Sequence, residues 1–221
     1  MAKEVKKENE AVVTAVNKVE LFLEENKKTI WGIIAAIAVI AGASYLYYKF
    51  AYLPKKAEAQ AQMYKAEATF RDGNYELALN GDGNVLGFKD IIGEYGTKAG
   101  KSVYLYAAIC ELQTGNADEA LSYLAKYSTR DEILAARAES LKGDAYCNKG
   151  DYKKAVACFE KAAGISDNVF KATYLLKAGQ AYEALGENAK ALDAYRTIKD
   201  QCGKSIEAYD IDKCITRLEV K

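Results

Sequence analysis

The pattern of apolar and polar residues divides the 221-residue chain into three parts. A charged lead of 28 residues is followed by an apolar run of 20 residues, and the remainder alternates between helix-length apolar stripes and short breaks centred on glycine. Apolar residues in these stripes recur every three or four positions, which is typical of helices with one buried face. The sequence therefore predicts an all-α protein.

The apolar run from Thr29 to Tyr48 contains no Asp, Glu, Lys, Arg, Asn or Gln. A helix of this length, at about 1.5 Å per residue, matches the roughly 30 Å hydrocarbon core of a bilayer. Lysines flank both ends, and aromatic side chains that favour the headgroup level lie just inside them: Trp31, Tyr45, Tyr47 and Tyr48. We predict a transmembrane helix over residues 29–48, a lead over 1–28 and a linker over 49–56.

Two other interpretations of the run are weaker. A cleaved signal peptide would use the small residues Ala41, Gly42 and Ala43, but the lead before it, with six lysines and six glutamates, is too long and too acidic for a signal sequence. A buried core helix that is apolar on every face would need a larger surrounding core than this chain supplies. A membrane anchor fits the pattern better.

The lead contains its own helical pattern, with Val12, Val16, Val19 and Leu23 at helical spacing. It predicts a short amphipathic helix that lies on the membrane surface, docks on a partner or is simply solvated. Lysines close to the apolar run do not decide the orientation of the span, whereas the whole lead, with its additional lysines, favours a cytosolic N-terminus.

Glycines at a nearly fixed spacing punctuate the rest of the chain. They are 42, 35 and 36 residues apart, and an alanine follows each by five residues. A glycine in the left-handed conformation can end a helix and reverse the chain, and an alanine allows two helices to cross closely. Seven residues before each glycine stands another small residue. The glycines are Gly73, Gly115, Gly150 and Gly186, the alanines Ala78, Ala120, Ala155 and Ala191, and the earlier small residues Ala66, Ala108, Gly143 and Gly179.

This register predicts a repeat domain over residues 57–221. Its helix hairpins occupy residues 59–95, 101–127, 136–165 and 172–200, and a last helix over 205–219 covers the open end of the stack. In the first hairpin the segment from Asn80 to Gly87 interrupts the second helix. Asn80, Asp82 and Asn84 alternate like a calcium-binding EF-hand loop, but Val85 and Ile91 replace its required Gly and Glu, so a structural loop is the better interpretation.

The segment LKGDAYCNKGDYKKAVACFEKAA, from Leu141 to Ala163, resembles a tetratricopeptide repeat. The fourth hairpin matches the family pattern almost as well, and the first two keep fewer of its positions. The resemblance covers roughly residues 57–200 and implies an α-solenoid. The family pattern of small residue, tyrosine, turn glycine, alanine, aromatic and alanine falls on Gly143, Tyr146, Gly150, Ala155, Phe159 and Ala162.

The same resemblance implies a protein-binding groove on the inner face of the first helix of each hairpin. In this interpretation the half of the groove nearer the span is apolar and the distal half polar; the alternative is that its apolar members are covered by neighbouring helices. The lysine and asparagine clamp of chaperone adaptors is not visible. The groove residues are Met63, Glu67, Phe70, Arg71, Leu105, Ile109, Leu112, Gln113, Arg137, Asp144, Asn148, Leu176, Gln180 and Glu183.

The layout from Val16 to Phe50, followed by alanine-rich repeats, resembles the YfgM-type inner-membrane proteins of bacteria. That resemblance implies a single span, a cytosolic N-terminus and a periplasmic repeat domain that handles newly translocated envelope proteins beside the Sec translocon. A subunit that helps to assemble an outer-membrane or cell-wall complex is the alternative within the same architecture.

Composition argues against other classes of function. Lysine plus arginine equals aspartate plus glutamate, at 31 each, so no positive field draws the chain to nucleic acid. Histidine is absent and the five cysteines form no CxxC pair, so we expect no metal, no cofactor, no small-molecule substrate and no catalytic residues. An enzyme of unrecognised type would have to use the carboxylates of Asp144 and Glu183, which we expect instead to be solvated or to bridge repeats.

Overall fold

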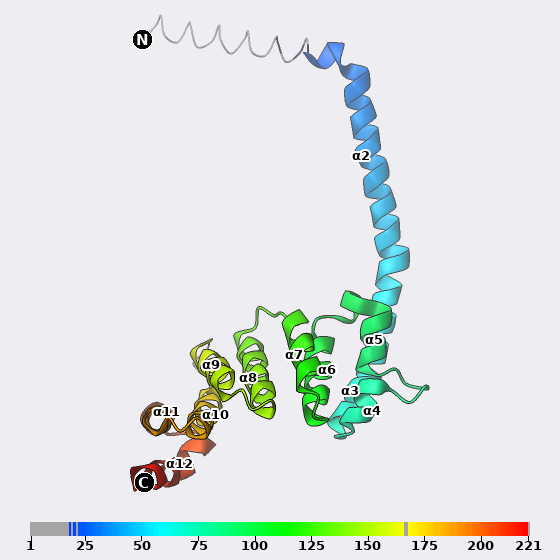
Figure 1. The fold of residues 1–221 in the computed structure, drawn as a ribbon. Helices are drawn as coiled ribbons and strands as arrows, with labels where there is room; N and C mark the ends of the chain where they lie inside the picture. Colours follow the sequence, from blue (N-terminus) through cyan, green and yellow to red (C-terminus); the bar gives the residue numbers. More distant parts are fainter. Residues whose placement is uncertain (1–17, 19, 21, 166–167, 221) are drawn as a thin grey trace, which may run out of the picture. The chain divides into compact units, whose positions relative to one another are not determined.

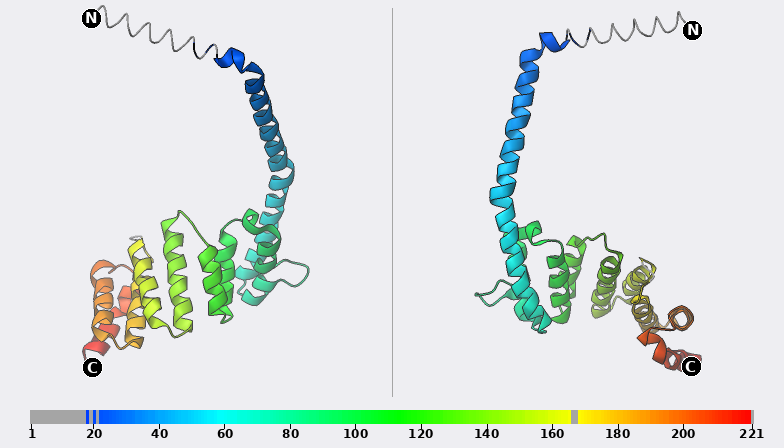
Figure 2. Two further views of the ribbon diagram at one scale, coloured as in Figure 1. Left: turned by 45° about the horizontal axis from the view of Figure 1, so that its top comes forward. Right: turned by 180° about the vertical axis from the view of Figure 1, so that it is seen from behind.

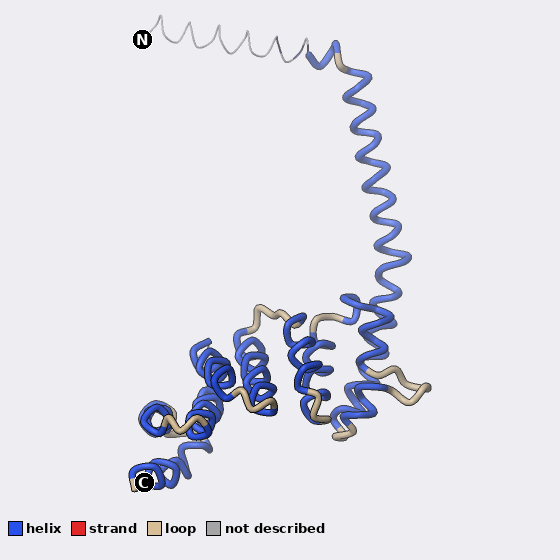
Figure 3. Tube along the Cα trace, in the orientation of Figure 1, coloured by secondary structure: helices blue, strands red, loops and turns tan. Residues whose placement is uncertain are grey.

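The computed structural model describes residues 18, 20, 22–165 and 168–220. The chain divides into two compact units, Met1–Pro54 and Lys55–Lys221, which are described separately. Among the described residues every regular element is a helix, and none is a strand (Figure 3). The all-α prediction is confirmed for that part of the chain.

The first unit consists mainly of one long helix, α2 (Lys27–Tyr47), none of whose residues is buried. It lies within a helical run, Lys27–Arg71, that is long and apolar enough to cross a membrane by length and composition. A short helical turn at residues 22–25 precedes α2, and the Asn26 side-chain amide donates to the carbonyl of Phe22 at 2.9 Å. The remainder of the predicted amphipathic helix, including Val12, Val16 and Val19, lies outside the described residues.

A π-helical turn, η1 (Tyr48–Tyr52), follows α2, and the backbone N–H of Leu53 donates to the carbonyl of Tyr48, five residues earlier. Pro54 explains this wider turn, because its ring has no N–H and crowds the carbonyl four residues before it. The residues expected to form a linker, 49–56, are therefore helical, since proline is tolerated in the first turn of the next helix, α3 (Leu53–Arg71).

The second unit is a row of helices, each beside its neighbours in the sequence (Figures 1 and 2). After α3 come two short helices, then three pairs of longer ones and a final helix. They are α4 (Tyr75–Asn80), α5 (Phe88–Tyr95), the 3₁₀ turn η2 (Gly96–Ala99), α6 (Ser102–Gln113), α7 (Ala117–Lys126), α8 (Glu132–Asn148), α9 (Tyr152–Ile165), α10 (Lys171–Ala184), α11 (Asn188–Gln201) and α12 (Ile206–Glu219).

The four turn glycines adopt the left-handed conformation that their spacing predicts, with φ between 73° and 87°. At Gly150 the backbone N–H donates to the carbonyl of Cys147, and the next N–H, of Asp151, donates to that of Tyr146, both at 2.9 Å. This Schellman pattern satisfies carbonyls that the helix end would otherwise leave unpaired. The second of these bonds recurs at all four turns, so each pair of helices reverses in the same way.

Small residues form the seam between paired helices. The predicted alanines of the second helices are all buried. The ring of Phe159 in α9 lies directly on Gly143 of α8, and the ring of Tyr195 in α11 lies on Gly179 of α10, so that a Cβ at either glycine would overlap the ring. The aromatic residue thus uses the space that the missing side chain leaves.

The interruption of the first pair is also as predicted, since residues 81–87 form a loop between α4 and α5. The carboxylate of Asp82 accepts hydrogen bonds from the backbone N–H groups of Asn84 at 2.9 Å and Val85 at 2.8 Å, which lowers its pKa. The aspartate therefore has a structural part in the turn.

Helix α12 ends the stack. Ile211, Ile215 and Leu218 pack into the same cluster as residues of α9, α10 and α11, while Asp210 and Lys213, on another face, are exposed and paired with each other at 2.6 Å. The Ser205 hydroxyl accepts from the N–H of Ala208 and so caps the helix, as Ser at this position favours. The exposed face of α12 is mixed, because Ile206 and Tyr209 are also exposed on it.

Substituting either seam glycine should destabilise the stack. We predict that Gly143→Ala and Gly179→Ala each lower the free energy of unfolding by about 1–3 kcal/mol, because the methyl group displaces an aromatic ring in a packed core. Urea denaturation followed by circular dichroism measures this. Gly164→Ala is the matched control: this glycine is also helical but faces open space, so alanine should leave stability unchanged or raise it. Equal effects at all three glycines would contradict the packing of aromatic rings on Gly143 and Gly179.

Candidate protein-interaction surface

Some apolar members of the predicted groove lie in or against the core, namely Met63, Leu105 and Phe70. Met63 is 5% exposed and Leu105 is 9% exposed. Phe70 is half-buried, and its ring contacts those of Tyr75, Phe88 and Tyr106, with centroids 5.3, 6.3 and 5.1 Å away. Met63 and Phe70 fill the space that the inserted helix α5 and the neighbouring helix α6 close, whereas Leu105 packs against α7 and α8.

The polar members of the groove lie at the surface. The exposed ones come from four successive first helices, α3, α6, α8 and α10: Arg71, Gln113, Arg137, Asn148 and Gln180. The others are half-buried, and Ile109 and Leu176 among them pack against core clusters: Glu67, Ile109, Leu112, Asp144, Leu176 and Glu183. The structure therefore separates a polar row from the apolar residues that share its helices.

Three predicted charges converge on a tyrosine that the sequence interpretation missed. Burial raises the pKa of Tyr106 in α6, the carboxylate of Glu67 raises it further, and the guanidinium groups of Arg71 and Arg137 oppose this. Charged groups of α3 and α8 thus act electrostatically on the same hydroxyl of α6. The ring of Tyr106 also stacks on Phe88, with centroids 5.3 Å apart, so it is held in place.

Tyr64 extends this patch. Its ring is exposed, and the guanidinium of Arg71 lies 5.9 Å from the ring centroid, a cation–π distance. Neither Tyr64 nor Tyr106 occupies a groove position in the repeat register, and so the register could not select them. The clue in the sequence was the spacing of Tyr64 and Arg71, seven residues apart on one helix face.

The two carboxylates that an enzyme would have needed bridge neighbouring helices instead. Asp144 accepts from Lys177 Nζ of the next pair at 2.7 and 2.9 Å. Glu183 accepts from Arg217 of α12 at 2.7 and 2.9 Å and from the hydroxyl of Tyr195 at 2.6 Å. Both therefore stabilise the stacking of repeats, as expected.

A buried carboxylate on α6 holds α5, the helix inserted in the first pair, in place. Glu111 is fully buried in α6, where Lys89 Nζ of α5 lies 2.9 Å from one carboxylate oxygen and the Asn116 amide donates to the other at 2.9 Å. The hydrogen bond to Glu111 raises the pKa of Lys89. A buried ion pair of this kind is costly to break by removing one partner, and it fixes α5 against α6.

Three of the cysteines, Cys110, Cys147 and Cys158, show the features of structural rather than reactive thiols. Burial raises the pKa of Cys110 to about 12 and also raises the pKa of Cys147 and of Cys158, so their nucleophilic thiolates are scarce at neutral pH. No group of three His, Cys, Asp or Glu among the described residues is arranged to hold a metal ion.

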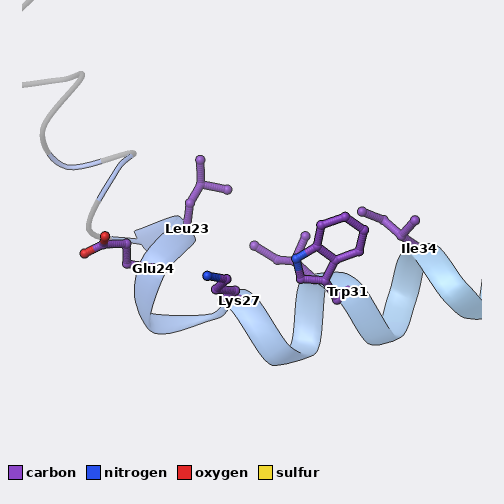
Figure 4. A pocket seen from close by; sticks show the side chains of 6 residues that line it. Leu23, Glu24, Lys27, Trp31 and Ile34 are labelled. Atoms are coloured by element: carbon purple, nitrogen blue, oxygen red, sulfur yellow. The ribbon is translucent and has the colours of Figure 1, made fainter.

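Two hollows lie in the described surface, one in each unit. In the first unit a notch follows the bend at Asn26, and Figure 4 shows Trp31, Lys27 and Leu23 around it. In the second unit a hollow of about 880 Å³ lies between the starts of α10 and α12. The second hollow is lined by Thr173 and Glu207, and the Thr173 hydroxyl donates to the Glu207 carboxylate at 2.5 Å.

Comparison with known proteins agrees with this architecture. The family model for the tetratricopeptide repeat matches residues 134–199. These residues cover α8 to α11, where the repeat pattern is clearest. Among solved structures, one described as the crystal structure of MamA protein is similar in fold, with a TM-score of 0.57 and 18% sequence identity, over 73% of this chain and 82% of that one. No curated protein matches the chain by sequence.

The buried tyrosine hydroxyls predict a loss of stability at alkaline pH. Burial and a hydrogen bond to Glu160 raise the pKa of Tyr182 to about 12, and burial with the bond to Glu183 raises that of Tyr195 as well. An unfolded tyrosine titrates near about 10. The free energy of unfolding should therefore be unaffected below about pH 10 and fall as the pH rises through the folded pKa values.

Urea denaturation at about pH 9 and about pH 11 tests this expectation. Tyr182→Phe and Tyr195→Phe should each reduce the alkaline loss, since phenylalanine cannot ionise. Tyr209→Phe is the control, because Tyr209 is exposed. The interpretation is wrong if the two buried-tyrosine variants lose as much stability as the unchanged protein.

Proposed function

We propose that the protein is a membrane-anchored scaffold of four tetratricopeptide-type helix pairs that binds other proteins along the exposed polar row of its first helices. The pairs are α3 with α4 and α5, α6 with α7, α8 with α9, and α10 with α11, and α12 caps them. The observation that carries the proposal is that exposed polar residues recur on the first helices of successive pairs, with Arg71 on α3, Gln113 on α6 and Arg137 on α8.

The chemistry of this surface suits a protein ligand. Within the described residues neither Arg71 nor Arg137 forms an ion pair, so both guanidinium groups are available to carbonyl or carboxylate oxygens. Arginine and tyrosine contribute strongly to protein interfaces because they combine a flat apolar surface with hydrogen-bond donors. Gln113, Asn148 and Gln180 would continue the contact along an extended segment of the partner.

The first unit supports the anchor. Apolar side chains cover α2 on every side, and large ones such as Val39 and Ile40 are strongly exposed. A helix apolar all round needs either a protein core or a lipid environment, and the described residues of this unit provide no core around it. A signal sequence would pass the same test of length and composition, but the charged lead argues against that alternative.

The placement of the anchor follows from the resemblance noted in the sequence. We propose a bacterial inner membrane, with the N-terminus in the cytosol and the repeat domain in the periplasm. The partners would then be envelope proteins handled near the translocation machinery. A subunit that assembles one envelope complex would use the same surface for a single stoichiometric partner.

Site-specific photocrosslinking in cells tests the binding surface. A benzophenone amino acid at Gln113 or Asn148 should give covalent adducts with other proteins, because both side chains lie in the exposed row. The same probe at Lys153, exposed on a second helix, is the control and should give few adducts. Mass spectrometry of the adducts separates many clients from one partner.

A charge-reversal variant tests whether the arginines of this surface contribute to binding. Arg137→Glu should lower the yield of adducts at Asn148, in line with a loss of about tenfold in affinity when an interface arginine is replaced. If adducts form equally from Lys153, or if only neighbouring segments of the same chain are trapped, the proposed surface is not the binding site.

Membrane extraction tests the anchor independently. The unchanged chain should stay in the membrane pellet after washing at alkaline pH, whereas Ile37→Lys with Ile40→Lys should release a large fraction, since each lysine at the centre of a span costs about 3 kcal/mol on insertion. An intact chain found entirely in the soluble fraction would rule out the anchor.

A further inference from the structure

The exposed polar row of the first helices carries positive charge without negative charge. Its members are Arg71, Gln113, Arg137, Asn148 and Gln180, so two of the five side chains are cations and none is a carboxylate. Neither arginine forms an ion pair within the described part of the chain. A surface charge that its own protein does not neutralise favours a ligand of the opposite sign.

The carboxylates at half-buried positions of the groove do not cancel this charge. Asp144 is paired with Lys177, and Glu183 with Arg217, both at 2.7 Å. In the second pair the cation is the more exposed partner, since 55% of the Arg217 side chain is exposed and 20% of that of Glu183. Of the groove carboxylates this leaves Glu67, a half-buried anion near two exposed arginines.

Acidic residues that are close to the arginines in sequence are directed elsewhere. Glu139 pairs with Lys161 of the second helix α9 at 3.1 Å. The carboxylate of Asp131 caps α8 by accepting a backbone N–H of its first turn. Glu132 is five residues from Arg137, and Asp72 is next to Arg71. At about 100° per residue, each of these two lies roughly 100° or more around the helix from its arginine.

Tyrosines accompany both arginines. The guanidinium of Arg71 lies 5.9 Å from the ring centroid of Tyr64. Arg137 acts electrostatically on Tyr106 of the preceding first helix and on Tyr174 of the following one, and burial raises the pKa of both hydroxyls, which therefore stay protonated at neutral pH. A guanidinium has five N–H donors and no acceptor. This part of the groove consequently offers mainly hydrogen-bond donors, which suits a ligand rich in acceptors.

The separation of the two arginines sets the spacing of the groups that they can hold. Helix α3 packs on α6 through the rings of Phe70 and Tyr106, whose centroids are 5.1 Å apart, and α6 shares a core cluster with α8. Packed helices lie about 8–10 Å apart, so Arg71 on α3 and Arg137 on α8 are separated by two such steps, roughly 16–20 Å. An extended segment advances about 3.3 Å per residue and covers this distance in about six residues.

We propose that the surface around Arg71 and Arg137 binds an extended acidic segment of a partner protein, in which two carboxylates about six residues apart meet the two guanidinium groups. Each guanidinium would hold its carboxylate through two parallel N–H bonds, a geometry that lysine does not offer. The amide of Gln113, on the helix between the arginines, would bond the backbone of the segment. The inference rests on the proposed function, because it names the partner of the same surface.

Fluorescence anisotropy with synthetic peptides tests the preference for acid. The full chain is held in detergent micelles, and every peptide has blocked ends, so that no terminal carboxylate contributes. One peptide carries two glutamates six residues apart in a segment of glycine, serine and asparagine. Matched peptides carry two glutamines or two lysines at the same positions, and a further one places the two glutamates side by side.

We expect the peptide with spaced glutamates to bind at least about tenfold more tightly than the glutamine peptide, with an affinity that falls as salt is added. The peptide with adjacent glutamates should bind more weakly than the spaced one, because it cannot reach both arginines at once. The lysine peptide should not bind.

Arginine variants locate the site. Arg71→Gln and Arg137→Gln should each weaken binding of the spaced glutamate peptide by about tenfold. Arg196→Gln is the matched control, because Arg196 is an exposed arginine of the second helix α11 that pairs with Glu219, and it should leave binding unchanged. Arg71→Glu combined with Arg137→Glu should transfer the preference to the lysine peptide, a result that a loss of folding could not produce.

The outcomes separate this inference from the proposed function. If glutamate and glutamine peptides bind equally while photocrosslinks at Gln113 persist, the binding surface stands and the preference for acid is wrong. If neither peptides nor crosslinked partners are found, both proposals fail. Acidic peptides that bind regardless of their spacing and of both arginines would show a general attraction for polyanions, and would overturn the inference.

Discussion

The contact between an aromatic ring and a glycine on the facing helix is the constraint on which the rest of the stack depends. Phe159 on Gly143 and Tyr195 on Gly179 fix how closely two paired helices approach and how they are rotated about their axes. The left-handed glycine at each turn makes that approach possible, because it reverses the chain without a long loop. Together they set which face of each helix is buried.

The surface properties follow from this packing. The first helix of each pair turns its small residues toward its partner and its apolar neighbours toward the core, which leaves a polar row exposed. Ion pairs such as Asp144 with Lys177 and Glu183 with Arg217 then link one pair to the next. Since each repeat contacts mainly its neighbours, charged groups at these junctions orient the stack without needing a single large core.

The repetitive part of the fold was predictable from the sequence, because turn glycines and small seam residues recur at nearly fixed spacing. The left-handed turn glycines, the buried alanines and the loop between α4 and α5 were all expected and are present. The helical form of residues 49–56 was missed, because Pro54 suggests a break in the chain although a first-turn proline is compatible with a helix.

The candidate site was less predictable. Register alone cannot tell that Met63 and Leu105 are covered, because Met63 is buried where the inserted helix α5 packs and Leu105 where α7 and α8 pack against α6. Nor can it find Tyr106, which gains its charged neighbours from helices far away in the sequence. The buried pair of Glu111 and Lys89 was missed for the same reason, since it joins the insertion to α6.

Nuclear magnetic resonance of the glycine Hα protons tests the packing most directly. If Phe159 and Tyr195 lie on Gly143 and Gly179, ring currents should shift the Hα resonances of both glycines strongly upfield, and each should show nuclear Overhauser contacts to its ring. Hα resonances at ordinary helical positions, with no contact to either ring, would contradict the seam and with it the account of the stack.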